Sequence, residues 1–282
     1  MPIIFEGNVR LAYRDPTCYY YEGEYHLFFT VSEKDGGYMY NRVGHSVSAD
    51  LKSFSEPELI TVKDYGKNFC SPGNVICRGG EYFICVSSYP MPFPFTEQGW
   101  ADDTARLFFI KTRDFKEFSE PMRIYPKGQG DFDEGRMIDP FVFEKDGEYN
   151  LFFKQSGVSL SKSRDLETWN FIGHTDGGEN ACVIEDGDRY ILIHSPRNGV
   201  GIKESRDLSS WTDLGVYTMD QDKWDFASGR LTAAFAMPAD EACGHKYVVF
   251  FHGSRADSEP ETHGAASLAY AYTDDFKEYY FD

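Results

Sequence analysis

Residues 163–169 read Ser163-Arg164-Asp165-Leu166-Glu167-Thr168-Trp169, and four variants of this phrase recur in the chain of 282 residues. The shared pattern is Ser or Thr, any residue, Asp, Leu or Phe, two further residues, and an aromatic residue. The variants begin at Ser48, Thr112, Ser205 and Thr273. An Asp at this position can bond backbone amides two residues ahead and close a tight turn, while the apolar residues anchor a strand. The repeat therefore predicts five copies of one structural unit.

A second recurring piece precedes each turn phrase. It consists of a strand, a Gly-containing turn and a further strand that has Tyr near its start. These tyrosines are Tyr25, Tyr82, Tyr149, Tyr190 and Tyr247. Short Gly-containing links between apolar runs are strong hairpin signals. Each unit is thus predicted to be a four-stranded antiparallel meander, with strands A to D, in which the Gly turn joins A to B and the Asp phrase joins C to D.

Five such meanders predict an all-β fold, a five-bladed β-propeller that forms a single domain over residues 1–282. The blades are expected at approximately 14–57, 70–122, 138–172, 178–217 and 228–282. Strand A of each blade should line the central channel. The links between units carry no Pro/Ser-rich linker, which argues against a string of separate small domains. The B–C loops and D–A links should share one end of the propeller, where we expect the functional residues.

The composition and the charge limit the classes of partner that we expect this protein to bind. The formal net charge of −18 disfavours nucleic acid, which binds through Lys and Arg, and favours a neutral ligand. The first seven residues lack a secretion signal and no later run could span a bilayer, so we expect a cytoplasmic protein without a membrane partner, although a mature secreted form would look the same. The six cysteines show no metal-ligand spacing, and we interpret them as reduced core thiols.

Acidic residues recur where strand A opens. The opening residues of blades 1 to 4 are Asp15, Ser71, Asp139 and Glu179, which lie ten or eleven residues before the Tyr of strand B. Charges buried around a channel are costly unless they are paired or useful. In glycoside hydrolysis one carboxylic acid protonates the leaving oxygen and a carboxylate activates water or attacks the sugar. A third carboxylate can adjust the pKa of the acid. An Asp-Pro pair alone is also a common turn opener.

The Asp15 region, Met137-Ile138-Asp139-Pro140 and Gly178-Glu179-Asn180-Ala181 together resemble the catalytic signature of five-bladed propeller glycosidases. The similarity is above all to glycoside hydrolase family 43, which is related to families 32, 68 and 117, and it covers essentially the whole chain. It implies that Asp15 is the general base, Asp139 the pKa modulator and Glu179 the general acid of an inverting hydrolysis of arabinosyl or xylosyl linkages in small oligosaccharides. Family 43 often has Glu-Gly-Pro where this chain has Glu179-Asn180-Ala181.

Family 32, the invertases and fructanases, provides an alternative. Arg136-Met137-Ile138-Asp139-Pro140 is similar to its Arg-Asp-Pro motif. This resemblance implies a retaining fructosidase with Asp15 as nucleophile, Asp139 as transition-state stabiliser and Glu179 as acid/base. That family carries a C-terminal β-sandwich, whereas this sequence ends at Asp282, which favours family 43. A non-catalytic sugar-binding or protein-interaction propeller is a further alternative, since this fold serves many functions.

Further candidates surround the channel mouth. We assign to substrate binding Ser71, Phe69, Trp100, Arg136, Arg197, Trp224 and Arg230. Aromatic rings can stack on sugars and Arg can bind hydroxyls or orient a carboxylate, although ordinary packing or an ion pair is the alternative for each.

His252, which follows strand B of blade 5, is the candidate metal residue, and His194 is expected at the matching place in blade 4. Related enzymes often place a His there, sometimes bound through water to a central Ca²⁺ or other ion, whereas a lone His is also commonly a core residue. No redox or nucleotide cofactor is expected, and the expected partner is a small carbohydrate.

Overall fold

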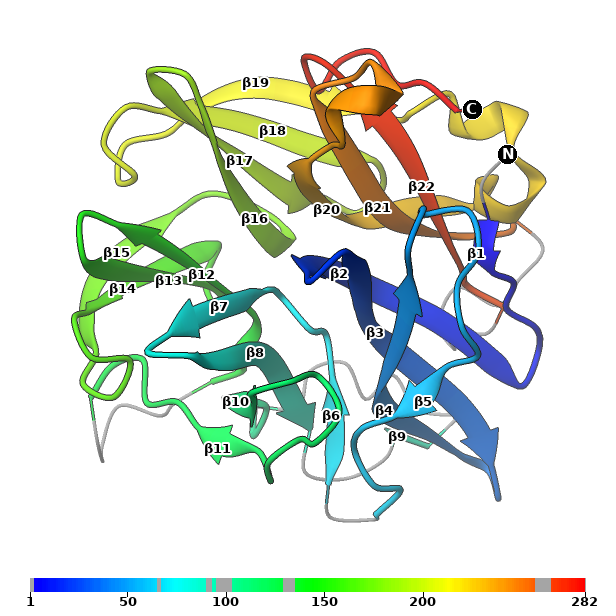
Figure 1. The fold of residues 1–282 in the computed structure, drawn as a ribbon, viewed down its shortest axis with the longest axis horizontal. Helices are drawn as coiled ribbons and strands as arrows, with labels where there is room; N and C mark the ends of the chain where they lie inside the picture. The colour runs from blue at the N-terminus through cyan, green and yellow to red at the C-terminus, as the bar shows by residue number, and fades with distance from the viewer. Residues whose placement is uncertain are drawn as a thin grey trace.

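The chain folds into a ring of antiparallel sheets around a central channel (Figure 1). The computed structural model describes residues 3–64, 67–89, 93–94, 103–128, 135–256 and 265–281. Within these residues five sheets follow one another around the ring, and each has the connectivity of a meander. The predicted five-bladed β-propeller is confirmed.

The strands of the first two blades come from residues 11–123. Blade 1 contains β2 (Leu11–Tyr21), β3 (Glu24–Asp35), β4 (Tyr38–Ser48) and β5 (Glu58–Leu59). In blade 2, strand A consists of two pieces, β6 (Asn68–Cys70) and β7 (Val75–Arg78), which both pair with β8 (Glu81–Tyr89). The blade continues with β10 (Arg106–Thr112) and β11 (Met122–Arg123). The short strand β9 (Phe93–Pro94) leaves blade 2 and pairs with β4 of blade 1.

The other three blades are more regular. Blade 3 contains β12 (Ile138–Lys145), β13 (Glu148–Lys154), β14 (Val158–Ser163) and β15 (Asn170–Thr175). Blade 4 contains β16 (Glu179–Asp186), β17 (Arg189–Ser195), β18 (Val200–Ser205) and β19 (Thr212–Tyr217). Blade 5 contains β20 (Arg230–Pro238), β21 (Tyr247–Ser254) and β22 (Ser267–Thr273). Short 3₁₀ helices are η2 (Gln221–Lys223), η3 (Asp225–Ala227) and η4 (Glu241–Cys243), and no helix in the described ranges is long and apolar enough to cross a membrane.

The N-terminus closes the ring. Strand β1 (Ile3–Phe5) is the outermost strand of blade 5, where Ile3 lies opposite Ala269 of β22 (Figure 1). The Phe5 ring packs 5.2 Å from the Phe29 ring of blade 1, measured between centroids. The first and last parts of the chain therefore hold the ring together without a covalent link. The sequence did not indicate this strand, because it is short and is paired with residues more than 260 positions away.

The recurring phrase forms the C–D turns. In blade 3 the Asp165 carboxylate accepts hydrogen bonds from the amides of Glu167 at 2.9 Å and Thr168 at 2.7 Å. The Ser163 hydroxyl accepts a bond from the Leu166 amide at 2.9 Å. Leu166 has a φ of 65°, which is costly for a non-glycine residue, and its side chain is buried. The equivalent bonds occur in the other four phrases, so these Asp residues are turn formers, as predicted.

The core lies between neighbouring blades, and strand B contributes most to it. Paired aromatic residues such as Phe28-Phe29 and Phe152-Phe153 are fully buried, because alternate side chains of a strand contact the blades on both sides.

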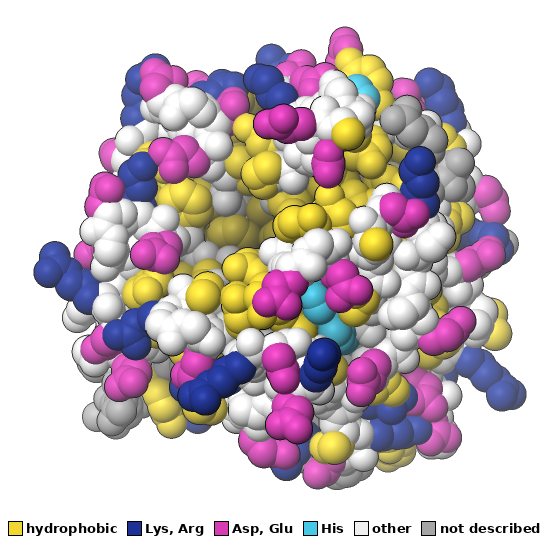
Figure 2. All heavy atoms as spheres, in the orientation of Figure 1, with side chains coloured by type: hydrophobic (Ala, Val, Ile, Leu, Met, Phe, Trp, Pro, Cys, Tyr) yellow, Lys and Arg dark blue, Asp and Glu magenta, His cyan; other side chains and the backbone are white. Residues whose placement is uncertain are grey.

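All six cysteines are free, but Cys77 is exposed, so it is not the core thiol that we expected. Acidic and basic side chains are interspersed over the face shown in Figure 2, which is hollowed near its middle where hydrophobic side chains border the depression.

Candidate active site

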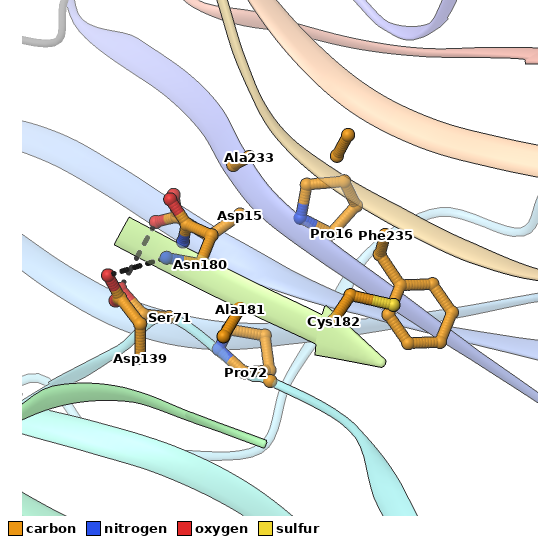
Figure 3. Close-up of a pocket in the computed structure, with 12 residues that line it drawn as sticks. Asp15, Pro16, Ser71, Pro72, Asp139, Asn180, Ala181, Cys182, Ala233 and Phe235 are labelled. Atoms are coloured by element: carbon orange, nitrogen blue, oxygen red, sulfur yellow. Dashed lines mark hydrogen bonds between the residues drawn. The ribbon is translucent and has the colours of Figure 1, made fainter. Parts of the chain in front are cut away.

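Strand A of every blade has one residue in the left-handed backbone region at the channel. Among the described residues these are Asp15, Ser71, Asp139, Asn180 and Ala233, with φ between 48° and 55°. In blades 1, 3, 4 and 5 the pairing of strands A and B is interrupted at this point by a bulge. Positive φ is rare for non-glycine residues and concentrates at functional sites. In blade 2 the break between β6 and β7 takes the place of the bulge, and all five positions line one pocket in the channel (Figure 3).

The pocket has a polar and an apolar end. Figure 3 shows Asp15, Ser71, Asp139 and Asn180 together at one end, while Cys182 and Phe235 lie at the other. Two of the three predicted catalytic residues, Asp15 and Asp139, are thus neighbours across the channel. Both are 4% exposed.

The structure corrects the alignment of blades 4 and 5. The equivalent of Asp15 and Asp139 in blade 4 is Asn180, and Glu179 lies one residue earlier. In blade 5 the equivalent is Ala233, and the predicted binding residue Arg230 lies three residues earlier. A uniform ten-residue spacing before Tyr190 would have identified Asn180. The eleven-residue spacing in blade 2 arises because its strand A is split into two pieces.

Asp15 is surrounded by groups that favour its ionised form. Its Oδ2 accepts hydrogen bonds from Thr30 Oγ1 at 2.9 Å and Ser71 Oγ at 3.4 Å, and Arg14 Nη2 lies 3.7 Å from its Oδ1. Burial by itself would raise the pKa of Asp15, but the Arg14 guanidinium and the Thr30 hydroxyl hold the pKa below its usual value. Asp15 is therefore a carboxylate at neutral pH, available as a base or a nucleophile.

His252 supports Asp15 from blade 5. Its Nδ1 accepts a hydrogen bond from the Asp15 amide at 3.1 Å, which places the ring proton on Nε2. Burial lowers the pKa of His252 to about 3, so the imidazole is neutral. No group of three or more His, Cys, Asp or Glu side chains in the described ranges could hold a metal ion. The observed partner of His252 is the Asp15 amide.

His194 does not match His252 in register. The residue of blade 4 that corresponds to His252 is Ser195, which pairs with Glu179 as His252 pairs with Thr232. His194 Nδ1 instead accepts a bond from the Gly178 amide at 3.0 Å.

Asp139 has the opposite electrostatic environment to Asp15. Its amide donates to Ser87 Oγ at 2.8 Å, and its Oδ2 accepts a bond from the Asn180 amide at 3.2 Å. Burial and the nearby Glu179 and Asp15 carboxylates raise the pKa of Asp139 to about 7. Asp139 thus lies within electrostatic reach of both other carboxylates.

Glu179 is the most accessible of the three. Its side chain is 33% exposed, and Oε1 lies 3.2 Å from Arg136 Nη2. Arg136 Nε in turn donates to the Tyr89 hydroxyl at 3.1 Å. Burial by itself would lower the pKa of Arg136, but Tyr89, Glu179 and Asp139 hold it above its usual value, so the guanidinium stays charged. Arg136 therefore lies in the site, and it connects Glu179 to Tyr89, which sequence reasoning missed.

Two of the remaining predicted binding residues lie near this group. Ser71 lines the pocket and bonds to Asp15. Arg230 is half-buried, and its Nε donates to the backbone oxygen of Arg197 at 3.0 Å. Burial lowers the pKa of Arg230, while Glu179 and Asp15 act in the opposite direction, which places both carboxylates within its electrostatic reach. Arg197 itself is exposed.

The predicted aromatic platforms are placed elsewhere. Phe69 is buried and packs edge-on against Phe108, with ring centroids 5.3 Å apart. Trp224 packs 4.6 Å from Phe281, and its indole N–H donates to the Met219 carbonyl. It lies between η2 and η3, and its contact with Phe281 places it beside the C-terminal end of the described chain. Trp100 lies outside the described residues.

Sequence reasoning also missed Arg14, Thr30, Ser87 and Asn180. Arg14 and Asn180 adjoin Asp15 and Glu179 in sequence, so their proximity was a usable signal. Thr30 and Ser87 lie in the second half of strand B, and each accepts a bond from an amide of the next blade. The pocket itself is lined by the ionised Asp15 and by Asp139, which binds its proton more tightly. Glu179 is not among the residues that line it and lies beside it, paired with Arg136. This arrangement can transfer protons to and from a polyhydroxylated ligand.

The fold and the comparisons with known proteins define the protein as a glycoside hydrolase of the five-bladed propeller class. The sequence model of the glycosyl hydrolases family 32 N-terminal domain matches residues 13–196, and the chain belongs to this family. The expected relationship to propeller glycosidases is confirmed, and the matching family is the one that the sequence analysis gave as the alternative to family 43. The substrate is therefore a carbohydrate. No match is found among curated proteins.

Solved structures share the fold over nearly the whole chain. The GH43_1 enzyme from Xanthomonas citri complexed with xylotriose is 13% identical, with a TM-score of 0.67 and coverage of 97% of this chain and 92% of that one. An exo-1,5-alpha-L-arabinanase from a bovine ruminal metagenomic library is 15% identical, with a TM-score of 0.67 and coverage of 99% and 98%. A family 117 glycoside hydrolase from Zobellia galactanivorans is 15% identical, with a TM-score of 0.70 and coverage of 93% and 84%. At these identities the likeness establishes the fold alone.

Proposed function

We propose that Asp15, Asp139 and Glu179 are the catalytic residues with which this glycoside hydrolase cleaves a glycosidic bond in a small oligosaccharide. The observation that carries the proposal is that two carboxyl groups, each 4% exposed, line one pocket in opposite surroundings. Asp15 lies beside Arg14 and accepts a bond from Thr30, whereas Asp139 lies near two other carboxylates. The pKa of Asp15 is lowered and that of Asp139 is raised, although the two line the same pocket. Paired carboxyl groups with divergent pKa values are typical of acid–base catalysis.

In the inverting form of this mechanism, Asp15 is the general base and Glu179 the general acid. Asp15 removes a proton from a water molecule that attacks the anomeric carbon, and Glu179 protonates the leaving oxygen. Asp139 stays between them and adjusts the protonation of Glu179. Ser71, Arg136 and Arg230 are the binding residues that the described site favours, because each lies within reach of the carboxylates.

Arabinosyl or xylosyl linkages are the substrates that we propose first. The similar structures include an enzyme complexed with xylotriose, an exo-1,5-alpha-L-arabinanase and a β-xylosidase. The expectation of an ion near the channel rests on resemblance, and it would involve His252 only through Nε2, since Nδ1 is bonded to the Asp15 amide.

A retaining fructosidase is the second candidate, and the family 32 match favours it. In that mechanism Asp15 attacks the anomeric carbon, Asp139 stabilises the transition state, and Glu179 acts first as acid and then as base. The lowered pKa of Asp15 suits a nucleophile as well as a base.

The experiment is a hydrolysis assay on nitrophenyl arabinofuranosides and xylosides, sucrose and short fructans. The wild-type protein should cleave one of these classes of substrate. Glu179→Gln should lower kcat/KM on that substrate at least about 100-fold, because an amide cannot donate the proton to the leaving oxygen. Glu185→Gln is the matched control, since Glu185 lies on the same strand but is exposed and paired with Lys145. Activity retained in Glu179→Gln would remove Glu179 from the acid role. NMR of the first-formed anomer separates inversion from retention.

A further inference from the structure

Neighbouring blades are joined at the channel by one recurring hydrogen bond. A side chain in the second half of strand B accepts a bond from the amide of the left-handed residue in the next blade. Among the described residues this bond occurs at four junctions, from Ser71 to Thr30 at 2.7 Å, Asp139 to Ser87 at 2.8 Å, Ala233 to Ser195 at 2.7 Å, and Asp15 to His252 at 3.1 Å. The acceptors are two serines, a threonine and a neutral histidine.

The junction between blades 3 and 4 departs from this pattern. The strand-B residue there is Lys154, which pairs with Ile138 as Thr30 pairs with Arg14 and Ser195 with Glu179. An ammonium group has three donors and no acceptor, so Lys154 cannot receive the amide. Its Nζ donates instead to the Gly177 carbonyl at 3.1 Å.

The amide that lacks this acceptor is the one that binds Asp139. Asn180 is the left-handed residue of blade 4, and its N–H donates to Asp139 Oδ2 at 3.2 Å (Figure 3). A serine or threonine at position 154 would offer this amide the same hydroxyl acceptor that it finds at the other junctions. Asp139 would then lose its backbone donor.

We infer that Lys154 is a positioning residue of the active site, which leaves the Asn180 amide free to hold the Asp139 carboxyl group. Its importance for catalysis rests on the proposed function, whereas the hydrogen-bond competition does not. Lys154 acts through Asn180 and Gly177 and itself need not touch substrate.

The inference predicts how Asp139 titrates. The charged and titratable groups that face it are Glu179 from β16, Asp15 from β2, Arg136 before β12, Cys70 from β6 and Tyr89 from β8. None of these changes in a Lys154 variant. A carboxylate that accepts two or three amide bonds has a pKa lowered by about two units, so loss of one bond should raise the pKa of Asp139 by about 0.5–1 unit.

The test compares Lys154→Ser with Lys154→Met. Both variants remove the ammonium group, but only serine supplies an acceptor. In each background the melting temperature is measured from pH 4 to pH 9 with and without Asp139→Asn. The native protein holds the Asp139 proton more tightly than the unfolded chain does. As the pH rises, the protein with Asp139 therefore loses stability relative to the Asp139→Asn variant, until the pH passes the native pKa of Asp139.

The end of this decline should lie about 0.5–1 pH unit higher in Lys154→Ser than in Lys154→Met. Coincident curves would overturn the inference. If Lys154→Ser does not fold, Lys154→Thr, which copies the Thr30 side chain of blade 1, serves instead, and the same two outcomes apply. The dependence of kcat/KM on pH should also differ between Lys154→Ser and Lys154→Met. A wild-type protein that hydrolyses no glycoside would refute the proposed function but would leave the stability measurement valid.

Discussion

Thr30 connects the first two blades to the catalytic site through a single hydroxyl group. Its Oγ1 accepts the Ser71 amide at 2.7 Å and donates to Asp15 Oδ2 at 2.9 Å, and the residue is fully buried. Thr30→Val keeps the shape and removes both bonds. A bond to a charged group contributes about 1.5–3 kcal/mol, and a buried amide left unsatisfied costs about 1–3 kcal/mol. Since the added methyl group returns about 1 kcal/mol, the free energy of unfolding should fall by about 2–5 kcal/mol.

Thr17 provides the matched control on the same sheet. It is also fully buried, but its hydroxyl has no hydrogen-bond partner in the described structure. Thr17→Val should therefore be neutral or stabilising, within about 1 kcal/mol. Urea denaturation of both variants at pH 7, followed by tryptophan fluorescence, measures the difference. Equal free energies of unfolding for the two variants would refute the assignment of Thr30 as a support of Asp15.

The pH dependence of the Thr30 variant separates its two lost bonds. The pKa of Asp15 is lowered in the folded protein, so its stabilising contribution is present above the unfolded pKa and is lost as the pH falls through the folded pKa. The penalty of Thr30→Val should therefore be largest near neutral pH and smaller in acid. The part of this penalty that comes from the unpaired Ser71 amide should remain at every pH. A penalty that does not change with pH would indicate that the bond to Asp15 contributes little.

Three further variants test other parts of the structure. Asp139→Asn should gain melting temperature relative to wild type between pH 5 and pH 8, because the raised pKa makes ionisation of Asp139 unfavourable to folding; a constant difference by calorimetry would contradict this. His252→Leu should lower the free energy of unfolding by about 1–3 kcal/mol in urea by leaving the Asp15 amide unpaired, whereas His252→Asn, which restores an acceptor, should recover part of the loss. Asp165→Ala should lower the melting temperature without changing kcat/KM, since the hydrogen bonds described for Asp165 lie within its own turn; a large loss of activity with unchanged stability would refute its structural role.

The number and connectivity of the blades were predictable from sequence because the responsible interactions are local. Asp165 and Ser163 satisfy amides only two or three residues ahead, so the turn chemistry is visible as a short repeated phrase. The Gly-containing hairpins are equally local, and together they specify four strands per unit. The positions of Asp15 and Asp139 followed from their equal spacing to the Tyr residues of strand B.

The assignment of the candidate site was less complete, because its contacts cross blades. Blades 3 and 4 carry the same bulge in strand A, and only the pairing with strand B shows that Asn180, not Glu179, holds the position of Asp139. The aromatic residues Phe69 and Trp224 are as suitable for packing as for stacking on sugars, and only their surroundings show that they contact other side chains of the fold.

The sequence by itself determined the repeated meander and the identity of two acidic residues that line the channel. The tertiary structure decided which groups set their protonation, since His252 reaches Asp15 across 237 positions and Asn180 reaches Asp139 across 41. It also decided how the ring closes, through β1 and β22 at opposite ends of the chain. Local hydrogen bonds are encoded in neighbouring residues, whereas these contacts exist only after all five blades have packed around the channel.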